Sequence, residues 1–308
     1  MDAPIYNVHR PRRSVFNVYR SSQMRLRHVV LMACVLFCWI WTFPLLCVGL
    51  IFCTPLFLFL TFWCTLFSCF LQWHNASWIC GDHWLRDIVS AIPWYEWFPC
   101  NTIHISNLPQ VVCVHPHGFL SCGALAGIHF VPGNRTIFCV APALFYIPIF
   151  GWCIRLLGCI PAKKDIMSRA LKQGYSILVV PGGVPEVVLS EKSEDTLLFL
   201  NQRFGFVKVA MTHRVPLLPV FVHGETALFE TLRWPCFKLR VLLSYRTNIP
   251  FILPLFLGWY GTWLPKRKPL TLTAGDWVTT KGVPLVVCKR AYVKHLRQLE
   301  KKIASIKL

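Results

Sequence analysis

The sequence predicts an α/β fold with a mostly parallel sheet flanked by helices, preceded by an N-terminal membrane-embedded helical hairpin. Two observations lead to this prediction. From Pro109 onward, short runs rich in Val, Ile and Leu are separated by turn residues and alternate with longer mixed stretches, as in βαβ units. Before them, residues 29–71 contain no Asp, Glu, Lys, Arg, His, Asn or Gln, which is typical of membrane-embedded segments.

The individual elements follow from the length and periodicity of each run. The segments QVVCVH, RTIFCVA, YSILVVPGG, PLLPVFVHG and FKLRVLLSY are predicted strands, and DIMSRALKQG and FLNQRFGFVKVAMTH are predicted helices. Active sites of such sheets gather at the carboxyl ends of the strands. The residues that follow each predicted strand are therefore the candidates for the active site.

Three segments make up the expected domain organisation. Residues 1–28 form a basic, cytosolic N-terminal segment. Residues 29–71 are long enough for two passes, since about 20 residues cross the hydrocarbon core, and Gly49 and Pro55 offer a turn between them. Because basic residues flank this run on both sides, the positive-inside rule places both ends in the cytosol. The alternative is one long kinked span followed by a lumenal domain.

Residues 72–308 are expected to form the main domain. It contains a second apolar segment, residues 249–265, which Pro250, Pro254 and Gly258 interrupt. We interpret this segment as a membrane-embedded loop, with a peripheral docking surface as the alternative.

Composition narrows the class of protein and of partner. Of 308 residues, 55% are hydrophobic and 15% charged, and the net charge is +19, whereas about a quarter of the residues of soluble domains are charged. Such a chain is expected in contact with membrane lipid and with a polyanionic partner. The hydrophobicity argues against nucleic acid as that partner. None of the 15 cysteines forms a CxxC pair, which favours reduced, buried thiols.

The segment His115-Pro116-His117-Gly118 ends the first predicted strand. The proline restricts the backbone on both sides, and the glycine leaves room for a ligand. Imidazole suits a general base, because its pKa lies near working pH. Two alternatives are a metal pair, for which no third ligand is close in sequence, and histidines that only satisfy carbonyl groups in a turn.

A second motif, residues 181–186, follows the predicted strand of residues 175–180. Gly182 and Gly183 permit a tight turn with exposed backbone N–H groups, and Glu186 is one of only 13 acidic residues. We expect its carboxylate to orient an imidazole and to stabilise the cationic form.

Together, HPHG, the segment APALFYIPIFGWCIRLLGCIPAKKD, VVPGGVPEVV, QRFGFVKVAMTHRVPLLPVFVHGE and the later LPKRKPLTLTAGDWV resemble, in this order, the type-2 diacylglycerol acyltransferase family, which includes monoacylglycerol and wax-alcohol acyltransferases. The resemblance covers about residues 29–285. It implies a glycerolipid-acyltransferase-like fold. The superfamily's usual His-x4-Asp is missing, because Leu120 and Cys122 are not acidic, which leaves Glu186 as the candidate carboxylate.

The resemblance also implies an activity, a location and partners. The activity is acyl transfer from acyl-CoA, a co-substrate rather than a cofactor, to a neutral lipid alcohol. Diacylglycerol comes first, and monoacylglycerol or a wax alcohol are alternatives. The expected location is the endoplasmic reticulum membrane with a cytosolic catalytic domain, and also the lipid droplet surface. A catalytically silent lipid-surface protein is the alternative of another class. Homo-oligomerisation stays open.

Residue roles complete the prediction. His117 is the expected base, and His115 is its structural or oxyanion partner, although the two could exchange roles. Glu186 is the third catalytic residue. No metal is expected. The expected substrate-binding residues are Pro116, Gly118, Gly182, Gly183, His223 and Glu225. The expected contacts to the phosphates of acyl-CoA are Arg203, Lys208, Arg214, Lys163 and Lys164.

Overall fold

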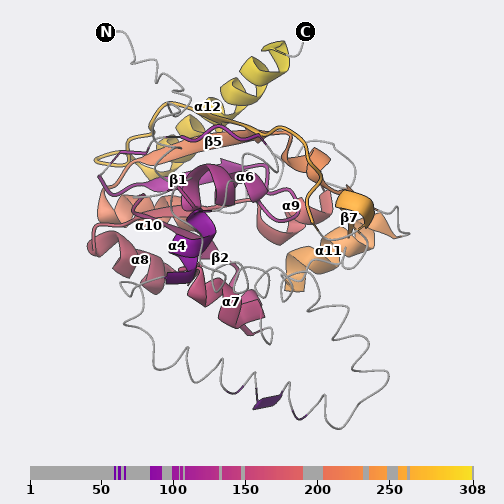
Figure 1. Ribbon diagram of the computed structural model, residues 1–308. Helices are drawn as coiled ribbons and strands as arrows, with labels where there is room; N and C mark the ends of the chain where they lie inside the picture. Colours follow the sequence, from indigo (N-terminus) through magenta and orange to yellow (C-terminus); the bar gives the residue numbers. More distant parts are fainter. Residues whose placement is uncertain are drawn as a thin grey trace.

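A six-stranded sheet in the order β3-β2-β4-β1-β5-β8 forms the centre of the molecule (Figure 1). The computed structural model describes residues 59, 62–63, 66, 84–91, 99–103, 105–106, 108–131, 134–146, 150–189, 204–231, 236–247, 256–261 and 264–306. The strands of this sheet are β1 (Val111–His115), β2 (Thr136–Val140), β3 (Ile160–Pro161), β4 (Ser176–Val179), β5 (Leu217–His223) and β8 (Thr271–Ala274). All neighbours pair in parallel except β5 and β8, so the predicted mostly parallel α/β sheet is confirmed.

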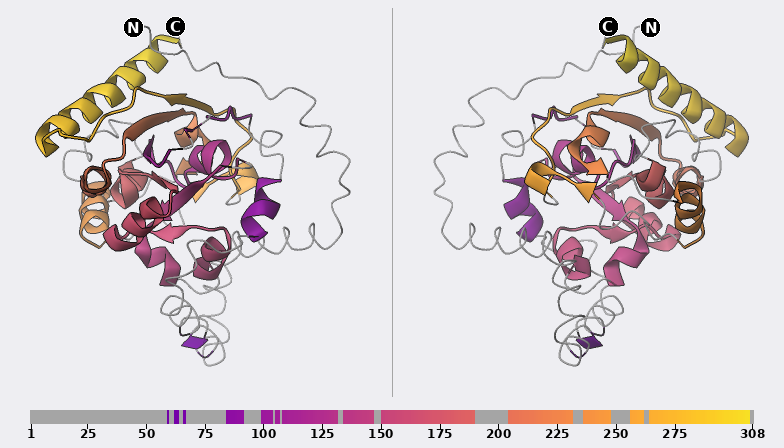
Figure 2. Two further views of the ribbon diagram at one scale, coloured as in Figure 1. Left: turned by 90° about the vertical axis from the view of Figure 1, so that its left-hand side faces the viewer. Right: turned by 90° about the vertical axis from the view of Figure 1, so that its right-hand side faces the viewer.

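Helices cover both faces of the sheet (Figure 2). They are α4 (Trp84–Ser90), α6 (Cys122–Ala124), α7 (Phe150–Leu156), α8 (Lys164–Lys172), α9 (Gly183–Leu189), α10 (Gly205–His213), α11 (Phe237–Thr247) and α12 (Leu285–Ile306). Single turns or short helices of other types are η2 (Leu125–His129), η3 (Pro142–Tyr146), η6 (Glu225–Leu228) and η7 (Trp259–Gly261). A separate antiparallel ribbon pairs β6 (Glu230–Thr231) with β7 (Phe256–Leu257).

The two faces of β1 build two separate cores, because successive strand residues point to opposite sides. Val112 and Val114 pack into a cluster with residues of η2, η3 and α7. Val111 and Cys113 pack into a second cluster with residues of α8, α10 and α12. All five residues of β1 are buried, as expected for a central strand of a parallel sheet. The backbone of the last residue, His115, is therefore held in place by the sheet.

One predicted strand is wrong: residues 237–245 lie in the helix α11. The alternation of apolar and polar residues from Phe237 to Val241 suggested a strand. In the structure Arg240 and Ser244, four residues apart, are buried, while Leu239 and Leu242 are about half exposed. Residues four apart share one face of a helix, so two polar side chains of α11 point inward beside the partly buried Val241. A hydrophobicity pattern that assumes an apolar interior cannot identify such a helix.

The membrane predictions concern residues that are mostly outside the described part of the chain. Of the predicted hairpin at residues 29–71, the structure describes only Phe59, Phe62, Trp63 and Leu66, which are helical and exposed. No helix among the described residues is both long enough and apolar enough to cross a bilayer. Within the predicted loop at residues 249–265, the described part forms β7 and η7. Residues 199–203 of the predicted helix at 199–213 also lie outside the described residues, and α10 begins at Gly205.

Candidate active site

Three predicted motifs come together at the carboxyl edge of the sheet, because β4, β1 and β5 are parallel neighbours. His115 is the last residue of β1, residues 181–186 follow β4, and His223 is the last residue of β5. Pro116 and Gly118, which follow β1, are buried. Sequence reasoning expected this edge to carry the site, and the parallel pairing confirms that these motifs share it.

His115 is 1% exposed and lies at the base of the site. Its Nε2 is 2.7 Å from the hydroxyl of Tyr292 on α12, and its Nδ1 has no hydrogen-bond partner among the described residues. Burial, and then the charge of the neighbouring His117, lowers the pKa of His115 to about 3. His115 is therefore neutral at every physiological pH, which excludes it as a cationic acid.

His117 is half-buried and more accessible than His115. Its Nδ1 lies 3.0 Å from the carbonyl oxygen of Gly118. Because a carbonyl oxygen only accepts hydrogen bonds, Nδ1 carries the proton in the neutral ring and Nε2 carries the lone pair. The Ser121 hydroxyl donates to the carbonyl oxygen of His117, which ties the loop to the start of α6. This tautomer is the one that a general base acting through Nε2 requires.

Glu225 holds the same loop from the β5 side. Its two carboxylate oxygens accept hydrogen bonds from the backbone N–H groups of Cys122, at 2.7 Å, and Gly123, at 2.8 Å. Burial raises the pKa of Glu225 to about 7, and these two N–H groups act against the increase. Gly118 has φ +57°, and a Cβ atom there would overlap Glu225 Cγ. Each Glu225 oxygen thus accepts a hydrogen bond from the backbone, which holds the loop, and a contact of Glu225 with substrate stays a prediction.

Glu186 approaches the loop from the β4 side, in the first turn of α9. It is fully buried, and burial raises its pKa to about 8, while the backbone N–H of His117 acts against this increase. A Cβ atom at Gly182 would overlap the Glu186 carboxylate, so the side chain folds back over its own turn. The contact of Glu186 is with the backbone of His117, whereas sequence reasoning expected the imidazole. The N–H of Gly183 donates to Val180 within the turn.

The basic residues expected to bind acyl-CoA do not gather beside the histidines. Lys163 and Lys164 are exposed at the start of α8, which follows β3. β3 is three strands from β1 in the sheet, so the two strands are about 14 Å apart. Lys208 is exposed on α10. Arg214 ends α10 before the amino end of β5, a strand length of about 20 Å from the site. Arg203 lies outside the described residues.

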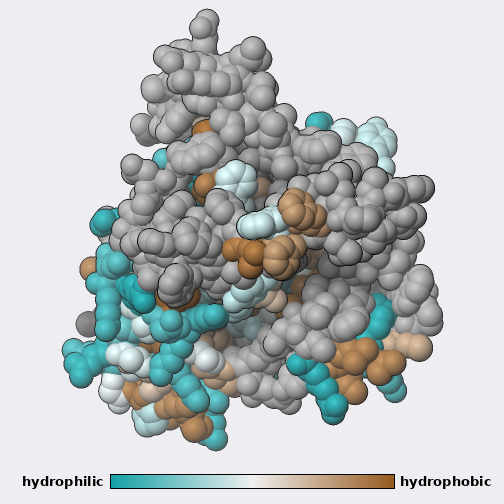
Figure 3. All heavy atoms as spheres, turned by 90° about the horizontal axis from the view of Figure 1, so that it is seen from below, coloured by the Kyte–Doolittle hydropathy of each residue, from teal (hydrophilic) through white to brown (hydrophobic). Residues whose placement is uncertain are grey.

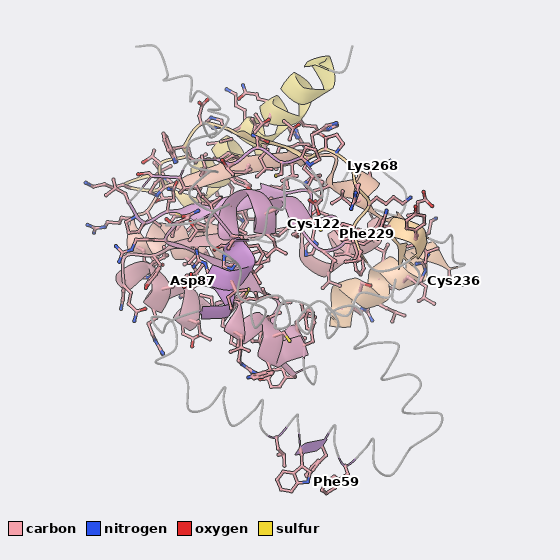
Figure 4. All side chains as sticks on the ribbon, viewed as in Figure 1. Phe59, Asp87, Cys122, Phe229, Cys236 and Lys268 are labelled. Atoms are coloured by element: carbon pink, nitrogen blue, oxygen red, sulfur yellow. The ribbon has the colours of Figure 1, made fainter. Side chains whose placement is uncertain are left out.

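An aromatic wall and Tyr292 were not predicted. The rings of Phe119 and Phe229 meet edge to face with centroids 5.4 Å apart. Figure 4 labels Phe229 and Cys122 on the side of the molecule where α6 and α9 lie. Tyr292 comes from the C-terminal helix, 177 positions from His115. The only signal for it in the sequence is a tyrosine on the apolar face of an amphipathic helix, which does not reveal its partner.

The family model for diacylglycerol acyltransferase matches residues 49–288, more than three quarters of the chain. The chain belongs to the diacylglycerol acyltransferase family. It is 29% identical over 260 residues to a protein named diacylglycerol O-acyltransferase 1 from Schizosaccharomyces pombe, covering 72% of each chain. It is 28% identical over 261 residues to 2-acylglycerol O-acyltransferase 1 from Bos taurus, covering 76% of each chain.

Further relatives of this diacylglycerol acyltransferase family member include human diacylglycerol O-acyltransferase 2, with 24% identity over 64% of this chain and 57% of the relative. Among solved structures, the crystal structure of the 1-acyl-sn-glycerophosphate (LPA) acyltransferase, PlsC, from Thermotoga maritima is similar with TM-score 0.41 and 19% identity. That match covers 79% of this chain and 96% of PlsC. The match to the diacylglycerol acyltransferase model ends at Cys288, four residues before Tyr292.

Proposed function

We propose that this protein transfers a fatty acyl group from acyl-CoA to a neutral lipid alcohol, with diacylglycerol as the acceptor and triacylglycerol as the product. The observation that carries the proposal is the His117 imidazole, whose Nδ1 donates to Gly118 and whose Nε2 holds the lone pair. Glu225 fixes the loop that carries it through two hydrogen bonds, and the buried Glu186 interacts with the His117 backbone N–H. Membership of the diacylglycerol acyltransferase family supports the same chemistry.

The reaction needs a base, an oxyanion donor and a dry site. Nε2 of His117 accepts the proton of the acceptor hydroxyl while its oxygen attacks the thioester carbonyl carbon. The carbon–sulfur bond then breaks, the ester carbon–oxygen bond remains, and the proton passes from His117 to the sulfur of coenzyme A. Glu186 and Glu225 keep the backbone of the loop in place during these steps. Phe119 and Phe229 supply apolar surface beside it.

A neutral acceptor fits the residues around the second motif better than a phosphorylated one. From Pro181 to Ser190 the chain has no basic residue, and the first is Lys192. A phosphate on the acceptor would need such a partner. Monoacylglycerol and wax alcohols lack phosphate as well, and relatives named 2-acylglycerol O-acyltransferase keep monoacylglycerol as the second candidate.

The helix α11 supports contact with membrane lipid. It exposes Leu239 and Leu242 between Lys238 and Arg246, and exposed apolar side chains beside basic ones suit a lipid surface. Trp152 on α7 is exposed as well. Figure 3 shows the molecule from below, the side on which α7 and α11 lie in Figure 1, and hydrophilic and apolar side chains lie next to each other there. We propose that this side faces the endoplasmic reticulum membrane or a lipid droplet.

The activity is tested by expression in cells that lack neutral-lipid synthesis, followed by lipid analysis. The wild type should form triacylglycerol from diacylglycerol, and His117→Ala should lose about 10² to 10⁴ in rate, the usual worth of a general base. His295→Ala is the matched control, because His295 lies on the outer part of α12 and contacts Asp276. If product forms only from monoacylglycerol or only from a long-chain alcohol, that alcohol is the acceptor in place of diacylglycerol. No product from any alcohol would favour the catalytically silent lipid-surface protein.

Topology is tested separately in sealed microsomes. We propose a hairpin at residues 29–71 with both ends cytosolic, so a C-terminal tag should be digested by added protease. A protected tag would show the alternative, a single span with a lumenal domain.

A further inference from the structure

The C-terminal helix α12 brings a buried hydroxyl group beneath the active site. Cys288, Tyr292 and Leu296 lie four residues apart and are all fully buried, so they form the face of α12 that packs on the sheet. The Tyr292 ring packs edge to face against Phe206 with centroids 5.3 Å apart. Phenylalanine would fill the same space. The hydroxyl of a buried tyrosine needs a hydrogen-bond partner, and its location therefore requires an explanation.

That partner is His115, whose Nε2 lies 2.7 Å from the Tyr292 oxygen. Burial raises the pKa of Tyr292, so the hydroxyl keeps its proton. Glu186 and the Cys113 thiol also act on this hydroxyl, and the thiol lies within hydrogen-bond reach of it while it points to the carbonyl oxygen of Val111. Thiol sulfur is a weak acceptor, whereas an imidazole nitrogen with a lone pair is a strong one. The hydroxyl proton is therefore directed to Nε2 of His115.

Donation to Nε2 fixes the tautomer of His115. The ring is neutral, because burial lowers its pKa to about 3, and a neutral imidazole carries a single N–H. When Nε2 accepts, the proton is on Nδ1. This Nδ1 is buried and has no hydrogen-bond partner among the described residues. A buried donor without a hydrogen-bond partner is unfavourable, and a substrate oxygen at this position would supply that partner.

We propose that Tyr292 is a positioning residue for acyl transfer: it donates to Nε2 of His115, so that Nδ1–H of His115 donates to the thioester carbonyl oxygen. As the acceptor oxygen attacks, that carbonyl oxygen gains negative charge and the hydrogen bond strengthens. No proton leaves Nδ1, because His117 takes the proton of the alcohol. This inference rests on the acyl transfer proposed above and assigns separate roles to the two histidines.

The first test is Tyr292→Phe, which removes the hydroxyl and keeps the ring against Phe206. We expect kcat to fall about tenfold or more. One oxyanion donor is worth about 10² to 10³ in rate, and without the hydroxyl the proton of His115 stays on Nδ1 in only a fraction of the molecules. The KM for acyl-CoA should stay within about twofold, because the bond strengthens only in the transition state. Tyr175→Phe is the matched control, since Tyr175 lies just before the amino end of β4, whereas the site lies at the carboxyl ends of the strands.

The second test replaces His115 by amides that copy one ring nitrogen each. In His115→Asn the amide NH₂ stands near the position of Nδ1, and in His115→Gln it stands near the position of Nε2. We expect His115→Asn to retain about tenfold more kcat than His115→Gln, because only Asn keeps the oxyanion donor. In the His115→Asn background, Tyr292→Phe should have no further effect on kcat, since an amide has no tautomer to fix.

Each outcome decides the inference. All rates are normalised to protein that elutes as a single species in detergent, and unfolding midpoints are measured in parallel. A Tyr292→Phe enzyme with wild-type kcat would overturn the inference while leaving acyl transfer intact. If that variant does not fold, equal kcat for His115→Asn and His115→Gln overturns the inference, and a tenfold preference for Asn supports it. A wild type that forms no acyl ester from any alcohol defeats the inference together with the proposed function.

Discussion

Glu186 and Glu225 hold the same histidine loop from two sides, yet they hold it differently. Glu225 accepts two short hydrogen bonds, from Cys122 and Gly123, and burial raises its pKa to about 7. Glu186 is stabilised as an anion by the backbone N–H of His117, and burial raises its pKa to about 8. Glu225 has the lower pKa of the two because it accepts hydrogen bonds from two backbone donors, and hydrogen bonds to the charged form favour ionisation. We infer that Glu225 is a structural clamp and that Glu186 is the group whose protonation state can change near the site.

The largest effect is expected at the clamp. Glu225→Gln replaces an oxygen by an NH₂ group that faces a backbone N–H, which leaves a buried donor unsatisfied and costs about 1–3 kcal/mol of stability. Activity should fall with it, because the loop that carries His117 is no longer held. Unfolding midpoints and specific activity in detergent measure the two effects. Gly118→Ala should reproduce both, since a Cβ there overlaps Glu225 Cγ and φ is +57°. A Glu225→Gln enzyme as stable and active as the wild type would contradict the role of Glu225 as a structural clamp on the loop.

A smaller effect, on turnover and not on folding, is expected for Glu186→Gln. Glutamine has the shape of protonated glutamic acid, the form that a pKa of about 8 favours at neutral pH, so the amount of folded protein should match the wild type. Turnover should fall by about 10², because an amide cannot gain or lose the proton that a carboxyl group with a pKa of about 8 exchanges. The measurement is acyl transfer from radiolabelled acyl-CoA, per folded enzyme. Unchanged turnover would make Glu186 structural, like Glu225.

Gly182→Ala should act on Glu186 alone. The added methyl group overlaps the Glu186 carboxylate and must displace it from the His117 backbone. We expect a loss of turnover similar to that of Glu186→Gln, and no further loss when the two changes are combined, because each change takes the Glu186 carboxylate away from the His117 backbone. Independent, additive losses in this double-mutant cycle would show that Gly182 serves the substrate directly.

The smallest effect concerns the pH dependence of stability. Glu186 has a higher pKa in the folded protein, about 8, than its ordinary value of 4.5. Its contribution to stability is therefore fully present below pH 4.5 and is lost as pH rises to about 8, because the unfolded chain releases the proton first. Glu186→Gln should be less sensitive to pH over this window, and its unfolding midpoint should exceed that of the wild type at the alkaline end. Parallel pH profiles for the two proteins would contradict the raised pKa.

The sequence predicted the parts of the fold that depend on local pattern. Four of the five predicted strands are present, and the motifs at the ends of β1 and β4 lie at one edge. The failure at α11 has a physical cause: Arg240 and Ser244 are buried while Leu239 and Leu242 are about half exposed, so the usual inside-outside pattern does not hold at these positions. Lys163, Lys164 and Arg214 were predicted near the site from charge alone, which carries no information about distance.

By itself, the sequence determined the α/β class, the family and the residues with suitable chemistry, because short-range periodicity and ordered motifs are written along the chain. Only the tertiary structure decided which groups meet. It placed Glu186 against a backbone amide of His117 and turned Glu225 into a clamp on α6. It also brought Tyr292 from the C-terminal helix to His115. Hydrogen bonds act over about 3 Å, so a contact between residues 177 positions apart exists only once the sheet and α12 have packed together.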